Sequence, residues 1–165
     1  MGAMPTFSVD LGSGSNPRNP YNYDRVLGVE ANEVGESILN CWIGLESIPL
    51  EDSSIDAVTA FDFLEHLPRA IWKDGKLENT FINTMNDVWR ILKPGGLFLA
   101  VTPVYPAAEA FQDPTHVNII TEQTIGYFTG RFQNIGKRYG FHGMFRQKVN
   151  NPGKTHIKWE LEAIK

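Results

Sequence analysis

The stretch VDLGSGSNP, residues 9–17, closes an apolar segment near the start of the chain. Gly12 and Gly14 let the backbone turn sharply and approach a bound group closely, because a glycine has no Cβ. A dinucleotide-binding loop carries a third glycine, which lets the next helix pack on the strand with the pyrophosphate at its N-terminus. Pro17 stands in place of that glycine. The loop therefore favours an adenosine ligand with a compact polar tail and without a pyrophosphate.

An acidic residue follows at the spacing typical of nucleoside-binding sheets. Glu30 ends the second apolar segment, 18 residues after Gly12. An acid at this strand end accepts hydrogen bonds from the ribose hydroxyls of an adenosine ligand. Two glycines alone fit an ordinary turn equally well. Together with Glu30 they predict a nucleoside site.

Apolar periodicity along the rest of the chain predicts an open α/β sheet. One amphipathic helix is expected over Asn79–Leu92, ended by the sequence KPGG at residues 93–96. A further helix is expected to start at Thr121, and the Pro- and Tyr-containing segment Gly12–Asp24 predicts an irregular crossover. The expected strands are Thr6–Leu11, Arg25–Glu30, a weaker Asn40–Gly44, Asp56–Phe63, Leu97–Thr102, Phe145–Val149 and Ile157–Ile164. The last two strands predict a hairpin at the edge of the sheet.

Composition limits the class of protein. The chain has 165 residues, 42% of them hydrophobic, so we expect one domain spanning residues 1–165. The sequence has no apolar run long enough to span a membrane, and its first ten residues lack the charged start and apolar run of a signal peptide. The single cysteine, Cys41, fits a reducing compartment. We therefore expect a cytoplasmic protein, with Cys41 as a small core residue.

Charge is unevenly distributed along the chain. The net charge of −4 argues against bulk nucleic-acid binding, but residues 131–158 contain seven Lys or Arg and no Asp or Glu. This basic stretch fits either an anionic acceptor or an edge strand protected from association by its cations. Arg146 and Lys148, on one face of a predicted edge strand, favour the second interpretation.

Four segments, in their order and spacing, resemble the class I S-adenosylmethionine-dependent methyltransferases. They are VDLGSGSNP at 9–17, LESIPLEDSSIDAVTAFDFLEHL at 45–67, VWRILKPGGLFLAVTP at 88–103 and DPTHVNIIT at 113–121. The resemblance implies a Rossmann-like, seven-stranded, mostly parallel sheet with an antiparallel edge hairpin and helices on both faces. The helices that usually precede the first strand have no counterpart in this sequence.

The resemblance also implies cofactor-binding roles by position. Asp10, Gly12, Ser13 and Gly14 would surround the methionine part of S-adenosylmethionine, and Glu30 would hold the ribose. Leu45 would contact the adenine, and Phe61 with Asp62 would line the methionine and the sulfonium. The sequence departs from the family where Gly44 replaces a common acid, and where the Pro/Tyr segment replaces the first crossover helix.

Methyl transfer from a sulfonium is an in-line displacement, so the protein mainly aligns the two reactants and excludes water. A hydroxyl acceptor also needs a base, for which the candidates are His66, His116 and Asp113, with His116 oriented by Asp113 as the preferred pair. The alternative is that Asp113 opens a turn and the histidines cap loops. The four histidines are scattered without paired ligand spacing, so the sequence predicts no metal site.

The predicted function is transfer of a methyl group from S-adenosylmethionine to an oxygen or nitrogen atom of a small-molecule or saccharide acceptor, with S-adenosylhomocysteine as product. An anionic acceptor suits the basic stretch, nucleic acid is not expected, and the oligomeric state stays open. A binding or scaffold protein that keeps the fold without turnover is the alternative. A nicotinamide-dependent oxidoreductase is a third class, against which Pro17 argues.

Overall fold

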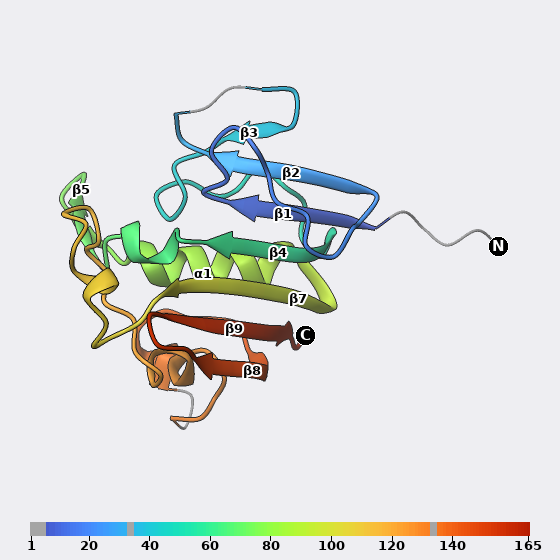
Figure 1. Cartoon of the computed structure of the whole chain (residues 1–165). Helices are drawn as coiled ribbons and strands as arrows, with labels where there is room; N and C mark the ends of the chain where they lie inside the picture. Colours follow the sequence, from blue (N-terminus) through green and yellow to red (C-terminus); the bar gives the residue numbers. More distant parts are fainter. Residues whose placement is uncertain (1–5, 33–34, 133–134) are drawn as a thin grey trace.

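The computed structural model describes residues 6–32, 35–132 and 135–165. Its centre is a seven-stranded sheet in the order β3-β2-β1-β4-β7-β9-β8 (Figure 1). The strands are β1 (Phe7–Leu11), β2 (Arg25–Glu30), β3 (Ile38–Asn40), β4 (Ile55–Phe61), β7 (Leu92–Pro103), β8 (Phe145–Pro152) and β9 (His156–Ala163). The pairings from β3 to β7 are parallel, whereas β9 runs antiparallel to both β7 and β8. The predicted mostly parallel sheet with an antiparallel edge hairpin is confirmed.

The remaining elements are short, with one exception. They comprise the helices α1 (Thr80–Ile91) and α2 (Ile135–Arg138), the 3-10 helices η1 (Leu64–His66), η2 (Ala108–Ala110) and η3 (Thr124–Tyr127), and a separate hairpin of β5 (Ile71–Lys73) and β6 (Lys76–Glu78). No helix in the described part of the chain combines the length and apolar character that crossing a membrane requires.

One face of the sheet packs against α1, which lies behind β4 and β7 in Figure 1. The apolar stripe predicted for this helix is buried: Met85, Val88 and Ile91 are fully inaccessible. They belong to one core with side chains that point to the same face of neighbouring strands, such as Val58 and Phe98. This packing, rather than helix propensity, stabilises α1.

The opposite face is crossed by the segment Gly12–Asp24, which forms no helix in the structure. Its contacts fall on residues that are in register across the sheet. Arg18 donates its backbone N–H to Asp10, and Pro17 packs against Gly28. Burial raises the pKa of Tyr21 to about 12, with a smaller contribution from the nearby charge of Glu160. The predicted irregular crossover is therefore confirmed, and in the described residues it takes the place of the helices expected on this face.

Three local predictions need correction. The weak third strand is Ile38–Asn40 rather than Asn40–Gly44, because only one further backbone bond, from Cys41 N to the Glu30 carbonyl, extends the ladder. The strand predicted to reach Phe63 ends at Phe61, since Asp62 turns the backbone with φ +49°.

The helix predicted to start at Thr121 is only the short η3. The Thr121 hydroxyl does accept the Gln123 N–H, and Ile125 and Phe128 do face inward, but the segment closes with 3-10 geometry. Gly126, over which the Phe132 ring is packed, and Gly130 with positive φ are poor residues for continuing an α-helix.

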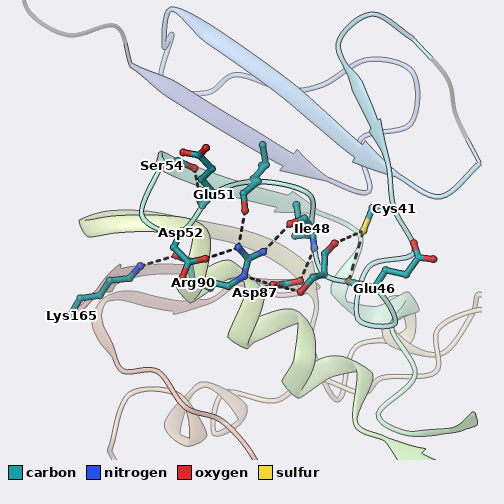
Figure 2. Close-up of polar contacts among 11 residues, drawn as sticks. Cys41, Glu46, Ile48, Glu51, Asp52, Ser54, Asp87, Arg90 and Lys165 are labelled. Carbon is teal, nitrogen blue, oxygen red and sulfur yellow. Dashed lines mark hydrogen bonds and ion pairs between the residues drawn. The ribbon is translucent and has the colours of Figure 1, made fainter.

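Arg90, near the end of α1, forms hydrogen bonds to the long segment that links β3 to β4 (Figure 2). Its guanidinium donates to the Asp87 and Asp52 carboxylates, and to the carbonyls of Ile48 and Leu50, at 2.7–2.9 Å. Asp87 in turn accepts the Ile48 N–H at 2.8 Å. One side chain thus supplies partners to a segment that has no strand or helix of its own.

Cys41 lies at the start of the same segment and is 1% exposed. Burial raises the pKa of its thiol to about 11, with a smaller contribution from the charge of Glu46. The thiol therefore stays protonated near neutral pH, as its interpretation as a small core residue predicts.

Candidate functional site

The predicted cofactor loop follows β1 at the carboxyl edge of the parallel strands, where open α/β sheets place their ligands. Gly12 and Gly14 have φ of +64° and +54°, a conformation that glycine adopts without a steric penalty. Gly14 donates its N–H to Glu30 at 3.3 Å, and the other Glu30 oxygen accepts the Ala31 N–H at 2.9 Å. The structure thus brings the predicted glycine loop and the predicted ribose acid together.

The two glycines differ in their surroundings. A Cβ on Gly12 would lie 2.2 Å from the Phe63 ring, whereas a Cβ on Gly14 would meet nothing within 4 Å. Ser13 folds back, with its hydroxyl on the Gly14 carbonyl and close to Gly28 of β2. The loop is therefore supported underneath by Phe63 and Gly28 and open at Gly14.

Asp10 is 2% exposed, and each of its two carboxylate oxygens accepts a hydrogen bond. It accepts the Arg18 N–H at 2.7 Å and the Thr59 hydroxyl at 2.6 Å. Burial raises the pKa of this carboxyl above its ordinary value, and these two hydrogen bonds partly oppose the shift. Asp10 thus links the segment after the glycine loop, at Arg18, to Thr59 of the neighbouring strand β4.

Leu45 is half-buried in a turn in which its N–H bonds to the Trp42 carbonyl at 2.9 Å. The preceding Gly44 has φ +85°, and a Cβ there would lie 2.6 Å from the Thr80 carbonyl at the start of α1. The departure from the family at position 44 thus has a structural cause, because the helix packs too closely for any side chain.

Phe61 and Asp62 end β4 beside the loop. The Arg18 guanidinium stacks 4.8 Å from the centre of the Phe61 ring. Asp62, with its carboxylate about half exposed, lies 3.2 Å from His156 Nε2 on the neighbouring part of the sheet. Sequence reasoning did not identify His156, because β9 reaches this point only through the antiparallel return of the chain.

The three predicted catalytic residues converge on one cluster. The rings of His66 and His116 meet edge to face with centroids 4.8 Å apart. Thr115 donates its hydroxyl to Asp113 at 2.6 Å and lies 2.9 Å from His66 Nδ1. These Thr115 hydrogen bonds lower the pKa of Asp113, which keeps it ionised.

Glu65 completes this cluster, and sequence reasoning missed it. His116 Nε2 is 4.0 Å from Glu65 Oε1 and also 4.0 Å from Asp113 Oδ2. Glu65 is 1% exposed, while the Asp113 side chain is 44% exposed. His116 therefore lies at the same distance from its predicted partner, Asp113, and from a second, buried carboxylate, that of Glu65. The adjacent letters Glu65-His66 carried the only local signal, and a helix start explained them equally well.

A cavity of about 320 Å³, a size that suits a small molecule, has on its wall Arg69, which follows η1 in the chain. Arg69, on its wall, bonds to Asn118, whose side chain in turn donates to the Leu64 carbonyl of η1. The other walls are formed by residues of η3, α2 and the start of α1, including Asn79, Phe81, Ile82, Thr124, Tyr127 and Tyr139.

Comparison with known proteins identifies the family. Residues 10–100, more than half of the chain, match the family described as "Methyltransferase domain". The chain belongs to this family, and the resemblance to class I S-adenosylmethionine-dependent methyltransferases is confirmed.

A relative from Mycolicibacterium smegmatis, named as a probable S-adenosylmethionine-dependent methyltransferase, is 36% identical over 59 residues. That match covers 36% of this chain and only 19% of the relative. Two solved structures have the same fold. The SAM-dependent methyltransferase of Archaeoglobus fulgidus matches with a TM-score of 0.60 at 13% identity, covering 96% of this chain and 86% of that one. The SAM-dependent methyltransferase of Aquifex aeolicus gives 0.61 at 15% identity, covering 96% and 82%.

Proposed function

We propose that this protein transfers a methyl group from S-adenosylmethionine to a small molecule that binds near the His66–His116 cluster. The observation that carries the proposal is the hydrogen bond from the Gly14 N–H to Glu30, because it holds the carboxylate that we propose as the ribose partner beside an open glycine loop. S-adenosylmethionine, when bound, supplies a methyl group on a positively charged sulfur. The protein then has to hold and align the two reactants.

The residues at the loop fit such a ligand. Glu30 offers carboxylate oxygens to ribose hydroxyls, and the space beside Gly14 admits a ligand close to the backbone. Because residues 15–24 form no helix, the loop lacks the helix N-terminus on which a dinucleotide rests its pyrophosphate. Phe63, whose ring lies beside Gly12, follows β4 and leads directly into η1, which carries Glu65 and His66.

The acceptor is proposed to be a small molecule or saccharide that presents an oxygen or nitrogen. Aromatic side chains on the cavity wall suit the flat face of a ring, and Arg69 offers a charge to an anionic group. The basic stretch gives less support to an anionic acceptor, because Arg146 and Lys148 both pair with Glu162 of β9, at 3.0 and 3.2 Å.

Calorimetric titration with S-adenosylmethionine, S-adenosylhomocysteine and NAD tests the cofactor. We expect binding of the first two and none of NAD. Detectable consumption of S-adenosylmethionine with any acceptor would exclude the alternative of a scaffold without turnover. Absence of binding by both adenosyl ligands would overturn the proposed function.

Glu30→Ala is expected to weaken S-adenosylmethionine binding by about 1–3 kcal/mol, through loss of hydrogen bonds to a charged group. Glu30→Gln, which keeps one acceptor oxygen, should lose less. Calorimetry at one salt concentration measures both, with Glu51→Ala, an exposed acid elsewhere, as control. Equal affinities for Glu30→Ala and Glu51→Ala would contradict the ribose placement.

A further inference from the structure

The cluster at the end of η1 has the properties of a metal site, against the expectation drawn from the scattered histidines. Glu65, His66 and His116 each place one ligand atom within 4.8 Å of the others. The sequence separates His66 from His116 by 50 positions, so no spacing motif could reveal the arrangement.

The hydrogen-bond network places a proton on Nδ1 of both imidazoles and leaves Nε2 of both out of these bonds. His116 Nδ1 lies 2.9 Å from the Glu109 carbonyl, which can only accept, so this nitrogen carries the proton. The Thr115 hydroxyl gives its proton to Asp113 and therefore accepts from His66 Nδ1. A histidine that keeps its proton on Nδ1 binds a metal through Nε2.

Glu65 supplies a buried carboxyl group in which only one oxygen has a hydrogen-bond partner among the described residues. Oε2 accepts the Thr102 hydroxyl at 2.9 Å, whereas Oε1 is buried without a hydrogen-bond partner among the described residues. No Lys or Arg of the described chain pairs with this carboxylate. A buried carboxylate without a cation is costly, and Oε1 faces His116 Nε2.

The separation of these two atoms suits an ion better than a proton. At 4.0 Å, Glu65 Oε1 and His116 Nε2 are too far apart for a hydrogen bond. Two metal–ligand bonds of about 2.1 Å bridge a gap of about 3–4 Å, depending on the angle at the ion.

We propose that Glu65, His66 and His116 bind a divalent transition-metal ion through one carboxylate oxygen and two imidazole nitrogens. This ligand set favours zinc, iron, cobalt or manganese over magnesium and calcium, which prefer oxygen ligands. Thr102, Thr115 and the Glu109 carbonyl each hold one ligand in orientation, which is the supporting shell that metal sites require.

The ion also gives the cluster a chemical role, which rests on the proposed function. Three protein ligands leave a coordination position open, and an acceptor hydroxyl bound there releases its proton to water more readily. The oxygen then forms its bond to the methyl carbon, while the electrons of the broken carbon–sulfur bond stay on sulfur. His116 Nε2 is a ligand in this arrangement, rather than the base predicted from the sequence.

The test uses the full chain stripped with a chelator and then titrated with zinc by calorimetry and with cobalt by visible absorption, without S-adenosylmethionine or an acceptor. We expect one ion per chain. His116→Ala and Glu65→Gln should weaken binding about 100-fold or more. His66→Ala, at a half-exposed position, should do the same even if a buried variant fails to fold. His142→Ala, an exposed histidine outside the cluster, is the matched control.

Failure of the wild-type chain to bind zinc or cobalt would overturn the metal site. So would binding that His66→Ala and His116→Ala leave unchanged, or equal binding of magnesium. S-adenosylmethionine binding measured with chelator present reports on the cofactor site alone. The failure of one proposal can therefore be told from the failure of the other.

Discussion

Replacing Gly12 with alanine is expected to weaken S-adenosylmethionine binding by roughly 100-fold or more. A side chain at φ +64° is strained by about 1–3 kcal/mol. The new Cβ would also lie 2.2 Å from a Phe63 ring atom, and relieving such overpacking costs about 1–3 kcal/mol more. The two effects together displace the loop from the geometry that the cofactor needs. Since about 1.4 kcal/mol corresponds to a tenfold change in affinity, a loss of roughly 100-fold or more is expected. Calorimetry with S-adenosylmethionine measures the loss.

Gly14→Ala is the matched control, because it has nearly the same backbone conformation and no neighbour within 4 Å. It carries the conformational strain without the clash, so its thermal stability should fall less than that of Gly12→Ala. Adding Phe63→Ala to Gly12→Ala should recover part of the lost stability. The same loss of stability in both single variants, with no recovery in the double variant, would contradict the role assigned to Phe63.

Arg90→Ala is expected to lower the free energy of unfolding by about 3 kcal/mol or more. Removing the guanidinium leaves the Asp87 carboxylate, with an 11% exposed side chain, without its cation. It also removes the hydrogen bonds that the Ile48 and Leu50 carbonyls accept from the guanidinium. Removing the cation from a nearly buried carboxylate in this way is among the more destabilising changes. Urea unfolding of the variant and the wild type measures the difference.

Arg146→Ala provides the comparison, since it breaks an ion pair of similar length in which the Arg side chain is 63% exposed. Such a surface pair contributes less than about 1 kcal/mol. Arg90→Lys keeps the charge but not the planar fork of donors, so it should fall between wild type and Arg90→Ala. Similar unfolding curves for Arg90→Ala and Arg146→Ala would show that the network in Figure 2 does not stabilise the segment.

The parts of the fold that sequence reasoning recovered are those with local signals. α1 has an apolar stripe at helical spacing, and β1 and β4 are short apolar runs with buried side chains on both faces. The β5–β6 hairpin was missed although Asp74-Gly75, with φ of +50° and +77°, forms a typical two-residue turn. Its strands are mostly exposed, so no apolar alternation flanks the turn.

The candidate site also contains residues that a local sequence signal marks and residues that it does not. The glycine loop and Glu30 lie at strand ends that the sequence marks, and β1 and β2 are neighbours in the sheet. Glu65 lies next to His116 only because Val117 and Asn118 donate their N–H groups to its backbone carbonyl, which brings a distant loop against η1. Loop-to-loop contacts of this kind leave no periodic trace in a sequence.

The segment Gly12–Asp24, which covers the second face of the sheet without a helix, is expected to open more easily than the strands beneath it. A helix holds its backbone by its own hydrogen bonds, whereas Gly12–Asp24 is held by separate contacts, such as Arg18 on Asp10 and Asp24 on Thr6. A segment held in this way opens locally at a free energy well below that of global unfolding. We therefore expect the amide hydrogens of residues 12–24 to exchange faster than those of the parallel strands, which pair along their length. Amide hydrogen exchange measured along the whole chain tests this difference.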